Sequence, residues 1–338
     1  MIETLIVDDS AISRNVIRNF LERDGNFRIV GEAADGEEAI QKILALNPDL
    51  VTMDIVMPKR NGLEVIETVM AKSSVPIVVI TSDNSAKIAY EATIKGALEF
   101  YPKDLFTAKL APEKRKEIYE TLKRISGIKS RKSATPVEPA LEQQPEGRSI
   151  HAVVIASSTG GPKALARFFS LLPGDFPAPV IVVQHNSSDF DESFAQWLNT
   201  FTALKVKLAE EGETPESGVV YIAQTGRHLT LRGNAGQGVV MRYNDDEPEN
   251  NQRPSADVLF RTAAESLGES LVSVVLTGMG SDGAEGTRKV REMGGIVLAQ
   301  DEESSLIYGM PKAAADTGCV DMVLPLDRIP EELVQLTK

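Results

Sequence analysis

Two stretches of the chain alternate short apolar runs with segments of helical spacing. In the first stretch, β-branched runs at 4–7, 27–32, 50–54, 76–81 and 98–101 predict strands. Apolar residues spaced by three and four predict helices at 11–23, 36–46, 61–71, 85–95 and 112–125. Strands that alternate with helices indicate a parallel sheet with helices on both faces. We therefore predict a doubly wound α/β domain over residues 1–125.

The periodicity stops after this domain and resumes later. Residues 126–149 are rich in Ser, Pro, Glu and Gln and predict a flexible linker. A second α/β domain is predicted over residues 150–338. Its expected strands are 152–156, 179–184, 271–276 and 295–299, and its expected helices are 162–171, 191–199, 256–267, 284–293 and 310–316. Four short apolar runs within 205–241 have no helical segment between them and predict an inserted set of antiparallel strands.

Composition narrows the class of protein. The chain has 338 residues, a net charge of −13 and one cysteine. The acidic balance argues against a chain that coats nucleic acid, and the second domain shows no basic helix-turn-helix pattern. A single cysteine excludes an internal disulfide and suits a reducing cytoplasm. No apolar run approaches the roughly 20 residues of a membrane span.

Polar side chains follow the predicted strands of the first domain where each strand ends. Asp8 and Asp9 follow the first strand, Asp54 ends the third, Thr81 ends the fourth and Lys103 follows the fifth. Each alone is better explained as a helix cap or turn residue. Together they lie at the ligand crevice of a doubly wound sheet, where three carboxylates would repel one another without a cation such as Mg²⁺. The lysine and the threonine hydroxyl would then hold a phosphoryl group bonded to one carboxylate.

In the second domain, the stretch VVIASSTGGPKALARFF (153–169) ends an apolar run with two serines and a glycine pair. It matches no phosphate-binding loop. A serine on a sharp turn between a strand and a helix exposes its hydroxyl, and the helix N-terminus favours developing negative charge. Ser158 is therefore a candidate nucleophile, with Ser157 as its rival. Alternation along the strand should point the two hydroxyls in opposite directions.

A serine nucleophile needs a base, and the chain has three histidines. His151 precedes the strand and would lie at the opposite end of the sheet. His228, in the inserted segment, could be a surface residue or could line the site. His185 ends the neighbouring strand and is the best candidate. Asp282 follows another apolar strand, where it could simply cap the next helix or could orient the base as in a Ser-His-Asp triad.

Both domains resemble known families. The motifs SSTGGPKAL, QHN, RPSADVLF, LTGMGSDGAEG and LIYGMPKAA make residues 150–338 similar to the catalytic domain of the CheB family of chemotaxis protein-glutamate methylesterases. Residues 1–125 resemble the flavodoxin-like receiver domain of two-component response regulators. The resemblance implies a phosphorylation-activated hydrolase of glutamyl methyl esters, which also deamidates glutamine. It implies methylated chemoreceptors as substrates and a CheA-type histidine kinase as phosphodonor, with neither nucleic acid nor membrane insertion.

The resemblance also assigns roles to individual residues. In the second domain it implies Ser158, His185 and Asp282 as the catalytic residues, Thr159 and Met279 as support for the oxyanion site, and no cofactor. In the first domain it implies Asp54 as the phosphorylated residue. The Mg²⁺ ligands would be Asp8, Asp9, Asp54 and the carbonyl of Val56, and the switch residues would be Thr81, Phe100 and Lys103.

The chain departs from the family patterns at three places. Asp104 follows Lys103 where receivers usually have proline, Ala156-Ser157 stands where Gly-Ala is usual, and Asn186 replaces an apolar residue. We expect the first departure to affect the shape of the loop and the last to affect substrate preference. We also expect the unphosphorylated receiver to inhibit the second domain by covering its strand-end loops.

Overall fold

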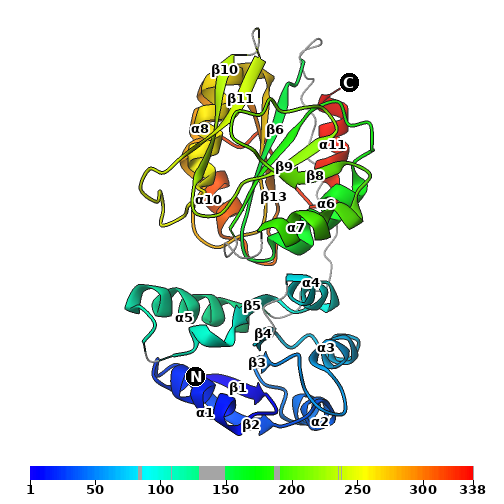
Figure 1. Ribbon diagram of the computed structural model, residues 1–338, viewed down its shortest axis with the longest axis vertical. Helices are drawn as coiled ribbons and strands as arrows, with labels where there is room; N and C mark the ends of the chain where they lie inside the picture. Colours follow the sequence, from blue (N-terminus) through cyan, green and yellow to red (C-terminus); the bar gives the residue numbers. More distant parts are fainter. Residues whose placement is uncertain are drawn as a thin grey trace. The chain divides into compact units, whose positions relative to one another are not determined.

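The computed structural model describes residues 1–82, 86–107, 109–128, 149–185, 191–234, 236 and 238–337 (Figure 1). The chain divides into two compact units, Met1–Lys132 and Ser133–Lys338. Most of the predicted linker lies outside the described residues. None of the helices in the described ranges combines the length and the hydropathy that a membrane span requires.

The first unit contains a parallel sheet of five strands, as predicted. The strand order is β2-β1-β3-β4-β5, so that β1 and β3 are neighbours. The strands are β1 (Ile2–Val7), β2 (Phe27–Ala33), β3 (Leu50–Met53), β4 (Ile77–Thr81) and β5 (Glu99–Pro102). The helices are α1 (Ala11–Glu22), α2 (Gly36–Leu46), α3 (Gly62–Met70), α4 (Ala86–Lys95) and α5 (Pro112–Ser126), with a 3₁₀ turn η1 (Lys103–Leu105).

The helices cover both faces of this sheet because each presents one apolar side. Apolar residues of α2, α3 and α4 pack against one face in a core that includes Ile43 and Ile66. Helices α1 and α5 cover the other face, where Phe20 contacts Phe106 and Tyr119. The register pairs Val7 with Met53, which brings the ends of β1 and β3 together.

The second unit is built on a parallel sheet of seven strands in the order β14-β13-β12-β6-β7-β9-β8. These are β6 (Ala152–Ser157), β7 (Val180–Gln184), β8 (Lys205–Leu208), β9 (Val219–Ile222), β12 (Leu271–Val275), β13 (Ile296–Gln300) and β14 (Met322–Leu324). Strands β10 (His228–Asn234) and β11 (Gly238–Asn244) form a separate antiparallel pair. The helices are α6 (Gly161–Leu171), α7 (Asp191–Leu198), α8 (Ala256–Leu267), α9 (Ala284–Glu292), α10 (Met310–Asp316) and α11 (Arg328–Leu336), with 3₁₀ turns η3 (Asn199–Phe201) and η4 (Gly268–Ser270).

The prediction of an antiparallel insertion is right for β10 and β11 and wrong for β8 and β9. Strand β8 pairs with β9 in parallel, and β9 pairs with β7 in parallel, so both extend the main sheet. The error arose because parallel neighbours are usually joined through a helix, and residues 209–218 cross back without one. The wholly buried run Val219–Ile222 is typical of a strand covered on both faces. Strand β14 and helix α11 at the chain's end were not predicted.

Candidate active site and phosphorylation site

Three adjacent strands bring the candidate catalytic residues to one edge of the second sheet. Strand β6 lies between β12 and β7, and Ser157 is paired with Gln184. Neighbouring strands lie about 4.8 Å apart, so Ser158 and His185, the next residues along, begin side by side. The His185 N–H donates to the carbonyl of Ser157 over 3.1 Å, which holds the two strand ends together.

The turn that carries Ser158 is short and held by main-chain hydrogen bonds. The Ser158 N–H donates to the carbonyl of Thr277 (3.1 Å), and its own carbonyl accepts from the N–H of Gly161 (2.7 Å). Gly160 has a φ of +79°, which favours glycine. A Cβ added there would also lie 2.7 Å from the Leu306 side chain. The Ser158 side chain is half-buried at this turn, directly before α6.

The two serines face different surroundings, as the alternation predicts. The Ser157 side chain is fully buried, and its hydroxyl donates to Oε1 of Gln184 over 2.7 Å. The Ser158 hydroxyl donates to no acceptor in the described part of the chain. This difference favours Ser158 over Ser157 as a group that a substrate could reach.

His185 and Asp282 form a buried pair. The Nε2 atom of His185 lies 2.9 Å from Oδ2 of Asp282, and both side chains are largely shielded from solvent. An ionised carboxylate can only accept a hydrogen bond, so in the neutral imidazole the proton lies on Nε2, which donates to Asp282. The Nδ1 atom is buried and has no hydrogen-bond partner among the described residues. Nδ1 therefore carries the free lone pair and is the basic atom of the ring. In the familiar triad the roles are reversed, and Nδ1 is the atom that contacts the aspartate.

Asp282 accepts hydrogen bonds from several donors at the start of α8. The Ser255 hydroxyl and the Ala256 N–H donate to it over 2.7 Å each, and the Asp257 N–H over 3.1 Å. Burial by itself would raise the pKa of Asp282, but the hydrogen bonds from His185, Ala256 and Ser255 lower it below its usual value. Asp282 therefore stays ionised, next to the positive end of the α8 dipole.

His228 supports Asp282 indirectly, through Ser255. Its side chain is fully buried, Nδ1 accepts the N–H of Ser255 (3.1 Å), and Nε2 lies 3.1 Å from the carbonyl of Glu247. Because Nδ1 accepts, the ring is neutral with its proton on Nε2. His228 is thus neither of the two alternatives considered from sequence; it holds Ser255, which holds Asp282. The RPSADVLF motif was the available signal for Ser255, since a serine before a helix usually caps it.

Several backbone N–H groups lie on the turn that carries Ser158 and on the loop that follows β12. The N–H groups of Thr159 and Gly160 donate to no acceptor in the described ranges, while the Ser158 N–H is used by Thr277. The carbonyl of Gly278 accepts from Gly309 and Met310. The N–H of Met279 belongs to the same planar peptide and points the opposite way. Thr277, which the sequence analysis did not single out, also donates its hydroxyl to the carbonyl of Thr159 over 3.1 Å.

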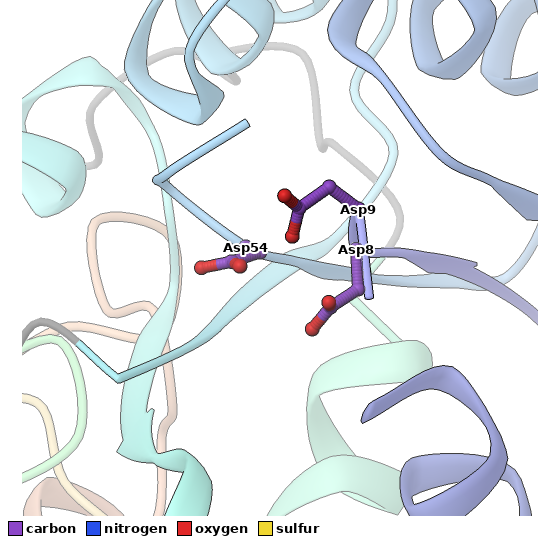
Figure 2. Close-up of side chains that lie close together, drawn as sticks. All are labelled: Asp8, Asp9 and Asp54. Atoms are coloured by element: carbon purple, nitrogen blue, oxygen red, sulfur yellow. The ribbon is translucent and has the colours of Figure 1, made fainter. Parts of the chain in front are cut away.

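Asp8, Asp9 and Asp54 meet in the first unit, at the ends of β1 and β3. One oxygen from each carboxylate can be chosen so that all three lie within 4.8 Å of one another (Figure 2). Lys103 Nζ lies 2.6 Å from Oδ2 of Asp54 and 2.7 Å from Oδ2 of Asp8. Burial raises the pKa of Asp8 despite the nearby Lys103 ammonium, and the Asp54 charge raises it further. Clustered hard oxygen donors of this kind fit Mg²⁺.

The structure also places the other residues predicted for the receiver. Thr81 is buried at the end of β4, and Phe100 is half-buried in β5. Val56 is exposed two residues after Asp54. Asp104 lies in η1, the 3₁₀ turn that begins with Lys103, so the absence of proline at this position still allows Lys103 to reach both carboxylates. Asn186 lies outside the described residues.

Comparison with known proteins assigns both parts of the chain to families. Residues 153–333 match the family described as CheB methylesterase, and residues 4–113 match the response regulator receiver domain. The chain belongs to the CheB methylesterase family. A relative from Pyrococcus horikoshii named protein-glutamate methylesterase/protein-glutamine glutaminase is 38% identical over 99% of this chain and 93% of its own length.

Other members of the family are similarly related. The protein of the same name from Thermotoga maritima is 38% identical over 99% of this chain and 98% of its own length. The crystal structure of the Thermotoga maritima CheB methylesterase catalytic domain is 43% identical and has a TM-score of 0.54. It covers 56% of this chain and 99% of that domain. The similarity therefore includes the receiver and the hydrolase unit in one chain.

Proposed function

We propose that the chain is a phosphorylation-controlled protein-glutamate methylesterase that also deamidates glutamine side chains. Its full-length relatives carry both activities in their names. The observation that supports the chemistry best is the buried His185–Asp282 pair next to the strand end that bears Ser158. The two activities need one mechanism, because an ester and an amide of the same carboxyl differ only in the leaving group.

Ser158 is the nucleophile in this proposal. Its Oγ attacks the side-chain carbonyl of a methylated glutamate while its proton passes to Nδ1 of His185. Asp282 stabilises the imidazolium that forms, through the contact at Nε2. The imidazolium then protonates the leaving group, and methanol departs from an ester or ammonia from an amide. Water attacks the acyl-enzyme with His185 as base, which releases glutamate and restores the Ser158 hydroxyl.

The oxyanion of each tetrahedral intermediate needs hydrogen-bond donors. The N–H groups of Thr159 and Gly160 are the best supported, because they donate to no other described group. The N–H of Met279 is a third candidate on the neighbouring loop. Loss of one such donor typically costs about 3–4 kcal/mol of transition-state stabilisation.

The receiver unit controls this reaction through Asp54. A histidine kinase of the CheA type supplies the phosphoryl group, and methylated chemoreceptors supply the substrate, both in the cytoplasm. Asp8, Asp9 and Asp54, with the Val56 carbonyl, would hold Mg²⁺, which neutralises charge on the phosphoryl group when bound. Lys103 would pair with a phosphoryl oxygen, and Thr81 and Phe100 would respond to it as switch residues.

Methanol release tests the proposed function. A methylated receptor fragment is incubated with the wild-type chain, with Ser158→Ala and with the matched variant Ser157→Ala. We expect methanol from the wild type and from Ser157→Ala but not from Ser158→Ala. Absence of methanol and ammonia from the wild type, with a small phosphodonor and Mg²⁺ present, would refute the proposal. It would favour a hydrolase-like unit that only binds receptors.

A further inference from the structure

We infer that Gln184 is a positioning residue that orients the nucleophile turn and the base together. Gln184 is the last residue of β7, directly before His185, and is paired with Ser157 of β6. The inference deepens the proposed function and rests on it, because it concerns the same reaction. It arises from the side-chain contacts of Gln184, the first residue of the QHN motif, to which the sequence analysis assigned no role.

The Gln184 amide is almost completely used. The side chain is buried, with 2% of its surface exposed. Its Oε1 accepts the Ser157 hydroxyl over 2.7 Å. Its Nε2 donates to the carbonyl of Ser158 over 3.1 Å and to the carbonyl of His185 over 3.0 Å. Both N–H donors of the amide are thus occupied by the main chains of the two residues that would react.

The contact between Gln184 and the Ser158 carbonyl is linked to the direction of the Thr159 N–H. The peptide between Ser158 and Thr159 is planar, so its C=O and its N–H point in opposite directions. The Ser158 carbonyl points toward Gln184 Nε2, and the Thr159 N–H therefore points away from Gln184. That N–H is a proposed oxyanion donor. Gln184 thereby acts on the nucleophile, the base and the oxyanion site through hydrogen bonds alone.

The second glycine of the motif makes room for this side chain. A Cβ added at Gly161 would lie 1.9 Å from Oε1 of Gln184 and 3.0 Å from the Ser157 Cβ. Gly161 is the first residue of α6, and its φ is not positive. Space for Gln184, rather than backbone conformation, therefore accounts for glycine at this position.

The experiment compares Gln184→Met, Gln184→Glu and the control Gln224→Met in the full-length chain. Methionine removes the donors but keeps the volume, while glutamate at neutral pH places an acceptor against two carbonyl oxygens. Gln224 lies just after the neighbouring strand β9 and donates Nε2 to the carbonyl of Ala209 (3.1 Å), away from Ser158. Each variant is measured for kcat and KM with a glutamyl methyl ester, and for the rate at which a fluorophosphonate labels Ser158. Thermal melting gives the folded fraction.

We expect kcat and the labelling rate to fall together by about 10²-fold in both Gln184 variants, the order expected for a displacement of about 1 Å. KM should stay within about threefold, and Gln224→Met should resemble the wild type. Gly161→Ala, which displaces the Gln184 amide without changing it, should show the same pattern. Labelling within threefold of the wild type, after correction for folded fraction, would overturn the inference. If the wild type is labelled but hydrolyses no ester, the proposed function fails and the labelling rates still decide the role of Gln184.

Discussion

Replacement of Asp282 by asparagine removes a charge from the centre of the proposed site with little change of shape. The carboxylate accepts hydrogen bonds at both oxygens, from His185 and Ala256 at Oδ2 and from Ser255 and Asp257 at Oδ1. A carboxamide offers only one acceptor. Whichever way it is oriented, its NH₂ group must face a main-chain N–H. The cost of one unpaired buried N–H is about 1–3 kcal/mol of folding stability.

The kinetic effect should be larger than the effect on stability. During attack, the His185 imidazolium would form 2.9 Å from the carboxylate of Asp282. At an effective dielectric constant of about 20, charges about 4 Å apart attract by about 4 kcal/mol. Loss of that attraction corresponds to about a 10³-fold decrease in kcat. If the NH₂ group turns toward Nε2 instead, the ring proton moves to Nδ1 and the base is lost, so the decrease would be at least as large.

The assay is methanol release under saturating methylated substrate, with thermal melting of the same preparations. Asp257→Asn is the matched control, because Asp257 is also a buried acid at the start of α8 but its carboxylate contacts Gly286 and Asn250 rather than His185. We expect Asp257→Asn to retain activity within about tenfold of the wild type. A kcat for Asp282→Asn within tenfold of the wild type, in a folded protein, would refute the electrostatic role of this carboxylate.

Three further outcomes can be measured. Ser158→Ala and His185→Ala should each abolish turnover, and the double variant should be no less active than either, because the residues act as a unit; multiplied losses would contradict this. Asp54→Asn should abolish the rise in methylesterase rate that a small phosphodonor produces, while the basal rate stays unchanged; an undiminished rise would exclude Asp54. Burial, together with the nearby Asp282 charge, raises the pKa of Asp257 from 3.8 to about 6. The folded state then binds more protons between about pH 4 and 6, so the stability contributed by this group should fall as pH rises through that range. The melting temperature of the wild type relative to Asp257→Asn should fall over the same range, and a difference independent of pH would contradict the shift.

Local patterns were sufficient for the first sheet, for most of the second, and for placing the candidate catalytic residues after neighbouring strands. Apolar runs bounded by helical spacing indicate parallel strands, and the carboxyl ends of parallel strands meet at one edge. For this reason Ser158, His185 and Asp282 could be grouped from their positions after three apolar runs. The same reasoning grouped Asp8 and Asp54. Ser158, His185, Asp8 and Asp54 each directly follow the last residue of a strand, whereas Asp282 lies seven residues after β12, in the loop that leads to α9.

Only the tertiary structure decided which partners the buried polar groups find. That β8 joins β9 in parallel depends on a helix-free crossover, which leaves no periodic signal. The choice of Nε2 over Nδ1 as the atom that contacts Asp282 depends on the direction of the His185 ring. The contacts of His228 with Ser255 and of Gln184 with Ser158 join segments whose spacing in the chain carries no information about distance in space. A buried amide or imidazole must satisfy its donors and acceptors wherever packing leaves it, so these roles follow from the assembled core rather than from any local stretch of residues.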